Sequence, residues 1–255
     1  MTEPVQEVVI LYCDTDALSQ EQIRHMEEAI SDGRKARLRP SMSAAKRLQH
    51  IAAGYLLELY LKRNGYPAVF SYEKHPSGKP YLVFADGTCA PHFSLSHSGT
   101  KVICAISPRP VGVDIEDKVY GDATKEAKAR MERIGQRFFT ESEQRYLAAH
   151  PEEFFGIWTY KEAMAKAYDE PLTEVFGTYD FENVREKIQD VDLSQGEAVE
   201  DHIFLVKTSI QVERECISTI KGEKSFTDEA KNDGFYRLAN AQFVGFLVDK
   251  ESKES

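Results

Sequence analysis

The order of the hydrophobic patterns along the chain limits its possible folds more than any other feature. A helical pattern runs over about residues 42–62, where apolar side chains recur every three or four positions. Strand and turn signals fill residues 69–115, and a second helical region covers about residues 125–168. Strand-like runs return at residues 203–206, 210–212 and 243–248. We therefore expect an α+β protein whose halves each contribute helices and strands.

Local signals place the ends of several elements. Residues 8–12 form an apolar run that is typical of a buried strand, and Ser19 is placed to cap a helix that reaches about residue 30. Asn64-Gly65 is expected to end the long helix, and Ser98-Gly99 between two strand-like runs indicates a hairpin.

The best candidate for an internal boundary is the Ser-Pro-Arg-Pro segment at residues 107–110. We therefore expect an N-terminal α+β unit over residues 1–108 and a C-terminal α+β unit over residues 109–255. Two polar, weakly periodic stretches, 184–200 and 220–233, indicate loops or insertions.

Composition narrows the functional class. The chain has 255 residues, and 42% of them are hydrophobic, which is enough for a sizeable core. A formal net charge of −10 argues against a general nucleic-acid binder, because phosphate binding needs clustered Lys and Arg. No apolar run approaches the roughly 20 residues that span a bilayer, and the four cysteines form no CxxC pair. We expect a cytoplasmic protein with reduced thiols, no membrane association and no nucleic-acid partner.

The segment Val-Gly-Val-Asp-Ile-Glu at residues 111–116 contains the clearest candidate for chemistry. Because side chains alternate along a strand, Gly112, Asp114 and Glu116 fall on one face and the apolar residues on the other. Two adjacent carboxylates repel each other, and hard oxygen ligands of this kind suit Mg²⁺. A solvated strand face explains the same residues equally well.

A second candidate lies in the segment Trp-Thr-Tyr-Lys-Glu-Ala-Met-Ala-Lys at residues 158–166. Trp158, Glu162 and Lys166 are spaced by four, so they share one face of a helix. A surface Glu–Lys pair is the simpler interpretation. A carboxylate beside the chain's single tryptophan nevertheless calls for a partner such as a metal or a lysine.

Three shorter segments add weaker signals. Ser96 and His97 lie where a strand meets a turn, which is a position suited to phosphate contacts, although a plain hairpin turn accounts for them. Lys79 is presented by a Gly-Lys-Pro turn. Thr140 followed by Glu143 makes a capping box for the next helix, and this structural function is enough to explain the spacing.

Together and in this order, these segments resemble the 4′-phosphopantetheinyl transferase superfamily, in its larger, surfactin-synthetase-activating type. The strand Val-Gly-Val-Asp-Ile-Glu and the helix Trp-Thr-Tyr-Lys-Glu-Ala-Met-Ala-Lys match its two main motifs. The Gly-Lys-Pro, Ser-His-Ser-Gly and Arg-Phe-Phe-Thr segments match its minor ones. The resemblance covers about residues 34–166 and becomes loose after residue 169.

The resemblance implies two similar, pseudo-duplicated α+β lobes with coenzyme A in the cleft between them, in a monomer. It implies Mg²⁺, with Mn²⁺ as an alternative, held by Asp114, Glu116 and Glu162. Lys166 would contact a phosphate oxygen and help protonate the departing group. The coenzyme A contacts implied by matching position are Arg34, Arg37, Lys79, Ser96 and His97, while Arg47 and His50 compete for one further basic position.

The implied reaction moves phosphopantetheine from coenzyme A to a serine of an apo acyl, peptidyl or aryl carrier protein. A carboxylate or a metal-bound water must accept the serine proton, and Glu143 and Glu162 are both candidates. Because carrier proteins of this kind are usually acidic, an enzyme with net charge −10 needs a local basic or apolar docking surface, which we expect near the helix after Phe139. The alternatives are a non-catalytic coenzyme A- or carrier-binding homologue, or another Mg²⁺-dependent phosphoryl transferase.

Overall fold

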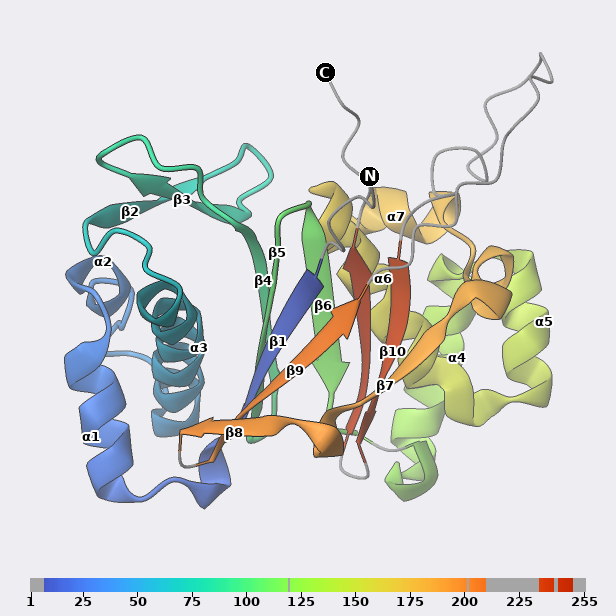
Figure 1. The fold of residues 1–255 in the computed structure, drawn as a ribbon. Coiled ribbons are helices and arrows are strands. Elements are labelled where there is room, and N and C mark those ends of the chain that lie inside the picture. The colour runs from blue at the N-terminus through green and yellow to red at the C-terminus, as the bar shows by residue number, and fades with distance from the viewer. Residues whose placement is uncertain (1–6, 119, 201, 210–233, 241–242, 250–255) are drawn as a thin grey trace, which may run out of the picture.

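The computed structural model describes residues 7–118, 120–200, 202–209, 234–240 and 243–249, and it confirms the mixed α+β class (Figure 1). The helices are α1 (Gln20–Ala29), α2 (Asp32–Lys35), α3 (Ala44–Arg63), α4 (Lys125–Phe138), α5 (Glu141–Ala149), α6 (Phe154–Tyr168) and α7 (Leu172–Thr178). The strands are β1 (Glu7–Asp14), β2 (Phe70–Lys74), β3 (Pro80–Phe84), β4 (His92–Ser98), β5 (Lys101–Ser107), β6 (Val111–Glu116), β7 (Gln189–Asp192), β8 (Glu197–Glu200), β9 (Ile203–Ser209), β10 (Gly234–Asn240) and β11 (Phe243–Asp249).

The first sheet is antiparallel, with the strand order β4-β5-β1-β9-β8. Its central strand, β1, pairs with β5 on one side and with β9 on the other. One face packs against α1 and α3 in a core that includes Leu11, Leu56 and Cys104. The strands of this sheet come from both sides of the boundary predicted at residues 108/109, so that division stays a prediction.

The second sheet has the order β6-β11-β10-β7, and its β7 pairs with β10 in parallel. Residues from the two sheets share one core, in which Val8 and Ile10 of β1 meet Val113 and Ile115 of β6. Helix α6 packs against β6 and β11, and α4, α5 and α7 surround it in a third core. The layers are therefore α1–α3, the five-stranded sheet, the four-stranded sheet and α4–α7 (Figure 1).

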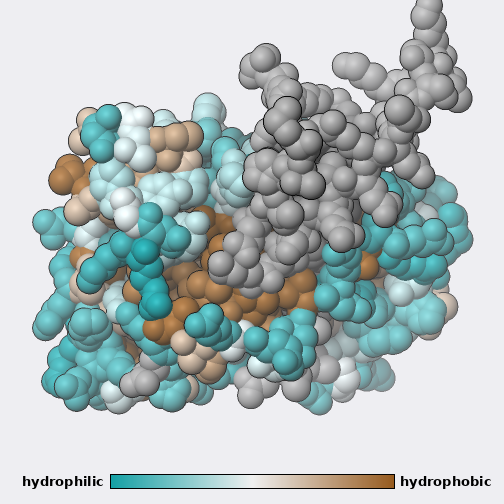
Figure 2. Space-filling model, in the orientation of Figure 1, coloured by the Kyte–Doolittle hydropathy of each residue, from teal (hydrophilic) through white to brown (hydrophobic). Residues whose placement is uncertain are grey.

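Strands β2 and β3 form a separate two-stranded sheet. Three of the large hydrophobic side chains that the described part of the chain exposes, Val69, Tyr81 and Val83, lie on or beside it. In the face drawn in Figure 2, hydrophilic residues cover the helices at both sides and hydrophobic residues gather in the middle. Over the described ranges, no helix is long and apolar enough to cross a bilayer.

Most of the predicted element boundaries are confirmed. Ser19 caps α1 with a complete capping box, and α3 ends at Asn64, followed by Gly65 at φ 74°. The predicted hairpin joins β4 to β5, with Gly99 at φ 53°, a left-handed value that suits glycine.

The prediction of a loop over residues 184–200 is wrong, because this segment contains β7, β8 and the short 3₁₀ turns Arg185–Lys187 and Leu193–Gln195. Strand β8 pairs with β9 and has only four residues, too few to produce a clear alternation of polar and apolar positions. The sequence also gave no signal for α7. The predicted strand at 210–212 and the predicted loop at 220–233 lie outside the described residues.

Candidate active site at the junction of β6 and α6

The site begins with a close approach of α6 to β6 at Gly112. A Cβ atom at Gly112 would overlap the carbonyl oxygen of Ala163 and the backbone nitrogen of Ala167. Only glycine leaves room for a helix backbone at this point of the strand. The glycine of the strand motif therefore places the helix motif, with Glu162 and Lys166, beside the carboxylates of β6.

An ion pair joins the two motifs. The Lys166 ammonium donates to Asp114 Oδ1 at 2.6 Å and to the Val113 carbonyl oxygen at 2.9 Å. The Asp114 side chain is 13% exposed and that of Lys166 is 29% exposed, so the pair is largely shielded from water. Shielding strengthens a charge-assisted hydrogen bond of this kind.

Serine hydroxyls attach β4 to the same strand. Ser94, Ser96 and Ser98 alternate along β4, so all three face β6. Ser94 Oγ accepts from the Val113 backbone N–H at 3.0 Å, and Ser96 Oγ accepts from that of Ile115 at 3.3 Å. These bonds replace a backbone ladder between the two sheets.

Two of these serines also hold the carboxylates. Ser96 Oγ donates to Asp114 Oδ1 at 2.7 Å, and Ser98 Oγ donates to Glu116 Oε1 at 2.6 Å. Ser96, expected to contact a phosphate, is thus buried against Asp114, and its phosphate contact stays a prediction. Alternation turns His97 the other way, towards α3.

The three carboxylates expected to bind Mg²⁺ influence one another electrostatically. The pKa of Glu162 is raised, first by burial and then by the negative charge of Asp114, while Lys166 opposes the rise and Glu116 adds to it. A divalent cation would relieve this repulsion, so the donor set fits Mg²⁺ in its chemistry.

The side chains as described do not converge on one point. Among the described residues, no group of three or more Asp, Glu, His or Cys side chains is arranged to hold a metal ion. Asp114 is engaged by Ser96 and Lys166, and Glu116 is engaged by Ser98 and Lys118. The ligand assignments therefore stay predictions.

Positive charge gathers on the α3 side of β4, in a group that we call the cation cluster: Arg34, Arg37, Lys46, His50 and His97. The ring centroids of His50 and His97 lie 5.9 Å apart. The pKa of His50 is lowered, first by burial and then by the charges of Arg34, His97, Lys46 and Arg37. Burial likewise lowers the pKa of His97, with Lys166 and Lys46 contributing. Such a cluster favours an anion.

The two arginines expected to grip a phosphate differ in exposure. Arg34 is buried against Gly54 of α3, and its guanidinium donates to the His50 carbonyl oxygen at 3.1 and 3.3 Å. Arg37 is half-buried, with its guanidinium 5.0 Å from the centroid of the Tyr72 ring. Arg47 pairs with Glu27 of α1 instead. Of the two competitors for the further basic position, His50 is the one that belongs to the cation cluster.

A cavity of about 380 Å³ lies beside the ion pair. Lys79, on the turn between β2 and β3, lines it together with Glu162 and Lys166. The Lys79 ammonium donates to the carbonyl oxygens of Val111, at 3.2 Å, and of Lys166. The remaining lining residues are Ser77, Pro80, Phe93, Ser94, Leu95, Ala165, Asp169, Glu170, Pro171 and Leu172.

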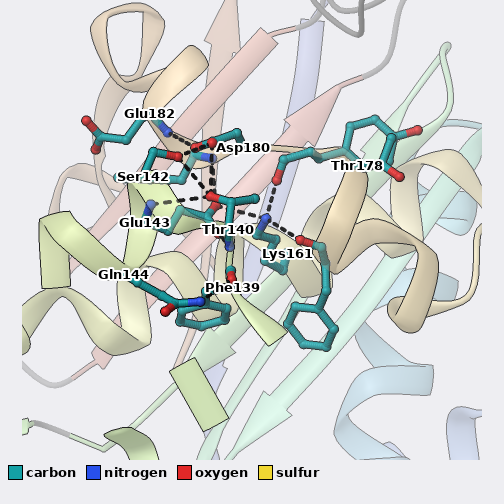
Figure 3. A network of polar contacts seen from close by, with 12 residues as sticks. Phe139, Thr140, Ser142, Glu143, Gln144, Lys161, Thr178, Asp180 and Glu182 are labelled. Atoms are coloured by element: carbon teal, nitrogen blue, oxygen red, sulfur yellow. Dashed lines mark hydrogen bonds and ion pairs between the residues drawn. The ribbon is translucent and has the colours of Figure 1, made fainter. Parts of the chain in front are cut away.

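Glu143 lies in a separate polar network (Figure 3). Its side chain is fully buried and ion-paired with the equally buried Lys161, with 2.8 Å between Oε1 and Nζ. Oε1 also accepts from the Phe181 backbone N–H at 2.7 Å, and Oε2 accepts from that of Thr140 at 2.9 Å. The capping box predicted for Thr140 and Glu143 is confirmed. The structure gives Glu143 a structural function, and its role as a base stays a prediction.

Lys161 is the residue that sequence reasoning missed. Its ammonium bonds to Glu143 and to the carbonyl oxygens of Phe176 and Tyr179, which tie α5, α6 and the segment after α7 together. Burial lowers the pKa of Lys161, and the charge of Glu143 opposes this effect. The one available signal was the largely apolar sequence on both sides of Lys161 and Glu162, over residues 154–160 and 163–165.

Comparisons with known proteins agree on one family. A sequence model of the 4′-phosphopantetheinyl transferase superfamily matches residues 110–219. A 4′-phosphopantetheinyl transferase of Bacillus subtilis is 29% identical over 161 residues, which cover 56% of this chain and 66% of the relative. The 4′-phosphopantetheinyl transferase gsp of Aneurinibacillus migulanus is 36% identical over 38% of this chain and 37% of its own length. The psf-1 transferase of Bacillus pumilus is 40% identical over 37% of this chain and 38% of its own length. The chain thus spans less than two thirds of each of these relatives.

Proposed function

We propose that the chain is a 4′-phosphopantetheinyl transferase, which transfers the 4′-phosphopantetheine arm of coenzyme A to a serine of an apo carrier protein; its similarity to that superfamily over residues 110–219 and to three named transferases supports the proposal. The observation that carries the proposal is the junction of β6 and α6. There, Gly112 admits the helix, and Lys166 pairs with Asp114 beside Glu162. An ion pair with a purely structural function would not require the carboxylates of Glu116 and Glu162 or the cavity beside it.

The residues at this junction suit the charges of the reaction. The carrier serine oxygen attacks the β-phosphorus of coenzyme A, a new P–O bond forms, and the bond to the bridging oxygen breaks as 3′,5′-ADP departs with its electron pair. Lys166 offers a positive charge and a proton to the departing phosphate. Mg²⁺, for which Asp114, Glu116 and Glu162 supply suitable oxygen donors, would neutralise pyrophosphate charge when bound.

The serine must also lose a proton. Glu162 is the better-placed acceptor of the two candidates, since it lines the cavity beside Lys166 and a raised pKa makes its carboxylate more basic. Glu143 is enclosed in the α5–α6 network, where Lys161 and two backbone N–H groups engage its oxygens.

The cation cluster and the cavity fit different parts of the nucleotide. We assign the 3′-phosphate to the cation cluster, where Lys46 is exposed and Arg37, His50 and His97 are half-buried. The adenosine end fits the cavity, where Phe93 and Leu95 offer apolar surface and Lys79 a cation.

A carrier protein would dock best on α4. This helix has five basic and two acidic residues, and Lys125, Arg130, Arg133 and Arg137 are exposed. A hollow of about 440 Å³ lies between α4 and α5, with Met131, Leu147 and Phe154 in its lining. Basic residues beside an apolar hollow suit an acidic partner. The helix after Phe139, α5, forms the other wall of the hollow but is not itself basic.

The finer architecture belongs to the same proposal. We propose two lobes, residues 1–108 and 109–255, with coenzyme A between them, in a monomeric cytoplasmic enzyme. The location of the cavity supports this placement of coenzyme A, since the lining of the cavity combines β3 and β4 with α6 and α7. The strands β8 and β9 would then reach across from the second lobe to complete the sheet of the first.

The test is a mass measurement. The protein is incubated with coenzyme A, Mg²⁺ and a panel of apo acyl, peptidyl and aryl carriers, and the intact carrier mass is recorded. We expect a gain of one phosphopantetheine, lost in Asp114→Ala and kept in Asp190→Ala, which changes an exposed aspartate on β7. Coenzyme A binding without any gain in mass would favour a non-catalytic homologue, and a different added mass would favour another phosphoryl transferase.

A further inference from the structure

Helix α6 ends at a residue with an unusual backbone. Asp169 has φ 60° and ψ 36°, in the left-handed region. Among the described residues that are not glycine, only Asp169 and His202 have a positive φ. Glycine adopts this conformation most readily, so a side chain here disfavours the fold unless its contacts compensate.

The side chain of Asp169 contacts the turn between β2 and β3, which we call the 75–79 turn. Asp169 Oδ1 accepts a hydrogen bond from Ser77 Oγ, and Oδ2 lies 3.8 Å from His75 Nδ1. Two backbone bonds close the turn, from the His75 N–H to the Lys79 carbonyl oxygen at 2.9 Å and from the Gly78 N–H to that of His75 at 2.8 Å. Asp169 thus holds a turn that is already internally ordered.

The same turn presents Lys79 to the cavity. Its ammonium bonds to the carbonyl oxygens of Val111 and Lys166, at the start of β6 and near the end of α6. Ser77, Lys79 and Asp169 all line the cavity. The 75–79 turn is therefore fastened to the β6–α6 junction through Lys79 and, separately, through Asp169.

We propose that Asp169 is a positioning residue for coenzyme A: it fixes the 75–79 turn against the end of α6, and so sets the shape of the cavity that takes the nucleotide end. This inference rests on the proposed function. Asp169 acts through Ser77 and Lys79 and does not touch the reacting atoms.

Electrostatics alone predicts the opposite effect on coenzyme A binding, so a binding measurement distinguishes the two explanations. Coenzyme A is a polyanion, and the carboxylate of Asp169 lies in the lining of the cavity proposed for it. If charge alone mattered, removal of this carboxylate would tighten binding. If positioning matters, removal weakens binding.

The experiment compares four variants of the full chain. Asp169→Gly removes the carboxylate and suits the left-handed backbone, while Asp169→Asn keeps an oxygen that can accept from Ser77. Ser77→Ala removes the partner hydroxyl. His202→Gly is the matched control, since it relaxes the other left-handed residue outside the cavity lining.

We expect Asp169→Gly to weaken coenzyme A binding, measured by calorimetry, by about five- to tenfold, the size of one lost hydrogen bond. Ser77→Ala should lose a similar factor, and Asp169→Asn and His202→Gly should bind as the wild type does. In transfer assays the loss in Asp169→Gly should fall on KM for coenzyme A and not on kcat. Amide hydrogen exchange of residues 77–79 in the ligand-free protein should accelerate in Asp169→Gly alone among the Asp169 and His202 variants.

Two failures are distinguishable. Unchanged or tighter coenzyme A binding by Asp169→Gly, with a wild type that binds coenzyme A, would overturn the positioning role and leave the proposed function standing. Weaker binding without faster exchange in residues 77–79 would also overturn it, because the turn would then not be what Asp169 holds. A wild type that binds no coenzyme A would refute the proposed function and this inference with it.

Discussion

At the scale of single residues, the buried pair Glu143–Lys161 shows how a motif can serve the fold and the site together. Lys161 precedes Glu162 in the chain, so the two side chains leave α6 in different directions. Lys161 points into the α5–α6–α7 core and Glu162 towards Asp114. Both ions of the buried pair have further hydrogen bonds, which is the condition under which such a pair is tolerated in a protein interior.

Loss of either member of this pair should destabilise the protein strongly. Lys161→Met leaves the Glu143 carboxylate buried with two backbone donors and no counter-charge, which we expect to cost about 3–5 kcal/mol in the free energy of unfolding. The double variant Lys161→Met with Glu143→Gln should recover much of this loss. Urea titration measures both, and equal destabilisation of the single and double variants would contradict the ion-pair interpretation.

His50 should make coenzyme A binding depend on pH. In the ligand-free protein, burial and the charges of Arg34, His97, Lys46 and Arg37 hold the pKa of His50 below its usual value, so its imidazole is neutral at pH 8. A bound phosphate dianion would raise that pKa, so binding takes up a proton and the affinity grows as the pH falls. We expect roughly threefold tighter binding at pH 6.5 than at pH 8.

Two controls isolate this effect. His50→Gln should flatten the pH dependence, and 3′-dephospho-coenzyme A should show little of it with the wild type. A pH dependence of equal size for both ligands would exclude His50 as a partner of the 3′-phosphate.

At the scale of the elements, the contact of α6 with β6 at Gly112 determines whether Glu162 and Lys166 can reach the carboxylates. Gly112→Ala would force the helix away from the strand. We expect a cost of at least about 1–3 kcal/mol in stability, together with loss of transfer in protein that still folds. The matched control is Gly177→Ala in α7, where an added Cβ meets nothing within 4 Å. Thermal unfolding measures the stability of both variants, and the carrier mass assay measures their transfer activity. An active Gly112→Ala would show that the close packing is dispensable.

The sequence predicted the elements that carry strong periodicity and missed those that do not. Helix α3 and strand β6 were predictable because their patterns run long or alternate cleanly. Strands β7 and β8 have four residues each and mostly exposed or half-buried side chains, so tertiary pairing decides their conformation.

Within the site, the pairing of Lys166 with Asp114 and the serine contacts of β4 could not be predicted. They depend on two sheets meeting at β4 and β6, which are not paired through backbone hydrogen bonds. The strand and helix motifs did predict where the carboxylates and the lysine lie. Residues two apart share a face of a strand, and residues four apart share a face of a helix. The division of Ser96 and His97 between opposite faces of β4 follows from the same alternation.

At the largest scale, the local charge of α4 is opposite in sign to the net charge of the chain. An acidic chain with a basic α4 should attract an acidic carrier to this helix, and salt should weaken that attraction. We expect kcat/KM for the carrier to fall several-fold as ionic strength rises from 0.05 to about 0.5 M. Arg130→Glu with Arg133→Glu should lower it at low salt. Lys62→Glu with Lys187→Glu, which changes exposed lysines elsewhere, should not. A carrier rate indifferent to salt would contradict docking on α4.

The position of β1 in its sheet has a consequence for how the chain folds during synthesis. Strand β1 is synthesised before both of its neighbours in the sheet, β5 and β9, and β9 ends at Ser209. Until β9 arrives, one edge of β1 has no strand beside it. At about 5–20 residues per second this wait lasts on the order of ten seconds or more. Many of the contacts that complete the protein join residues far apart in sequence, which is characteristic of slow folding and makes a nascent chain a natural client for chaperones.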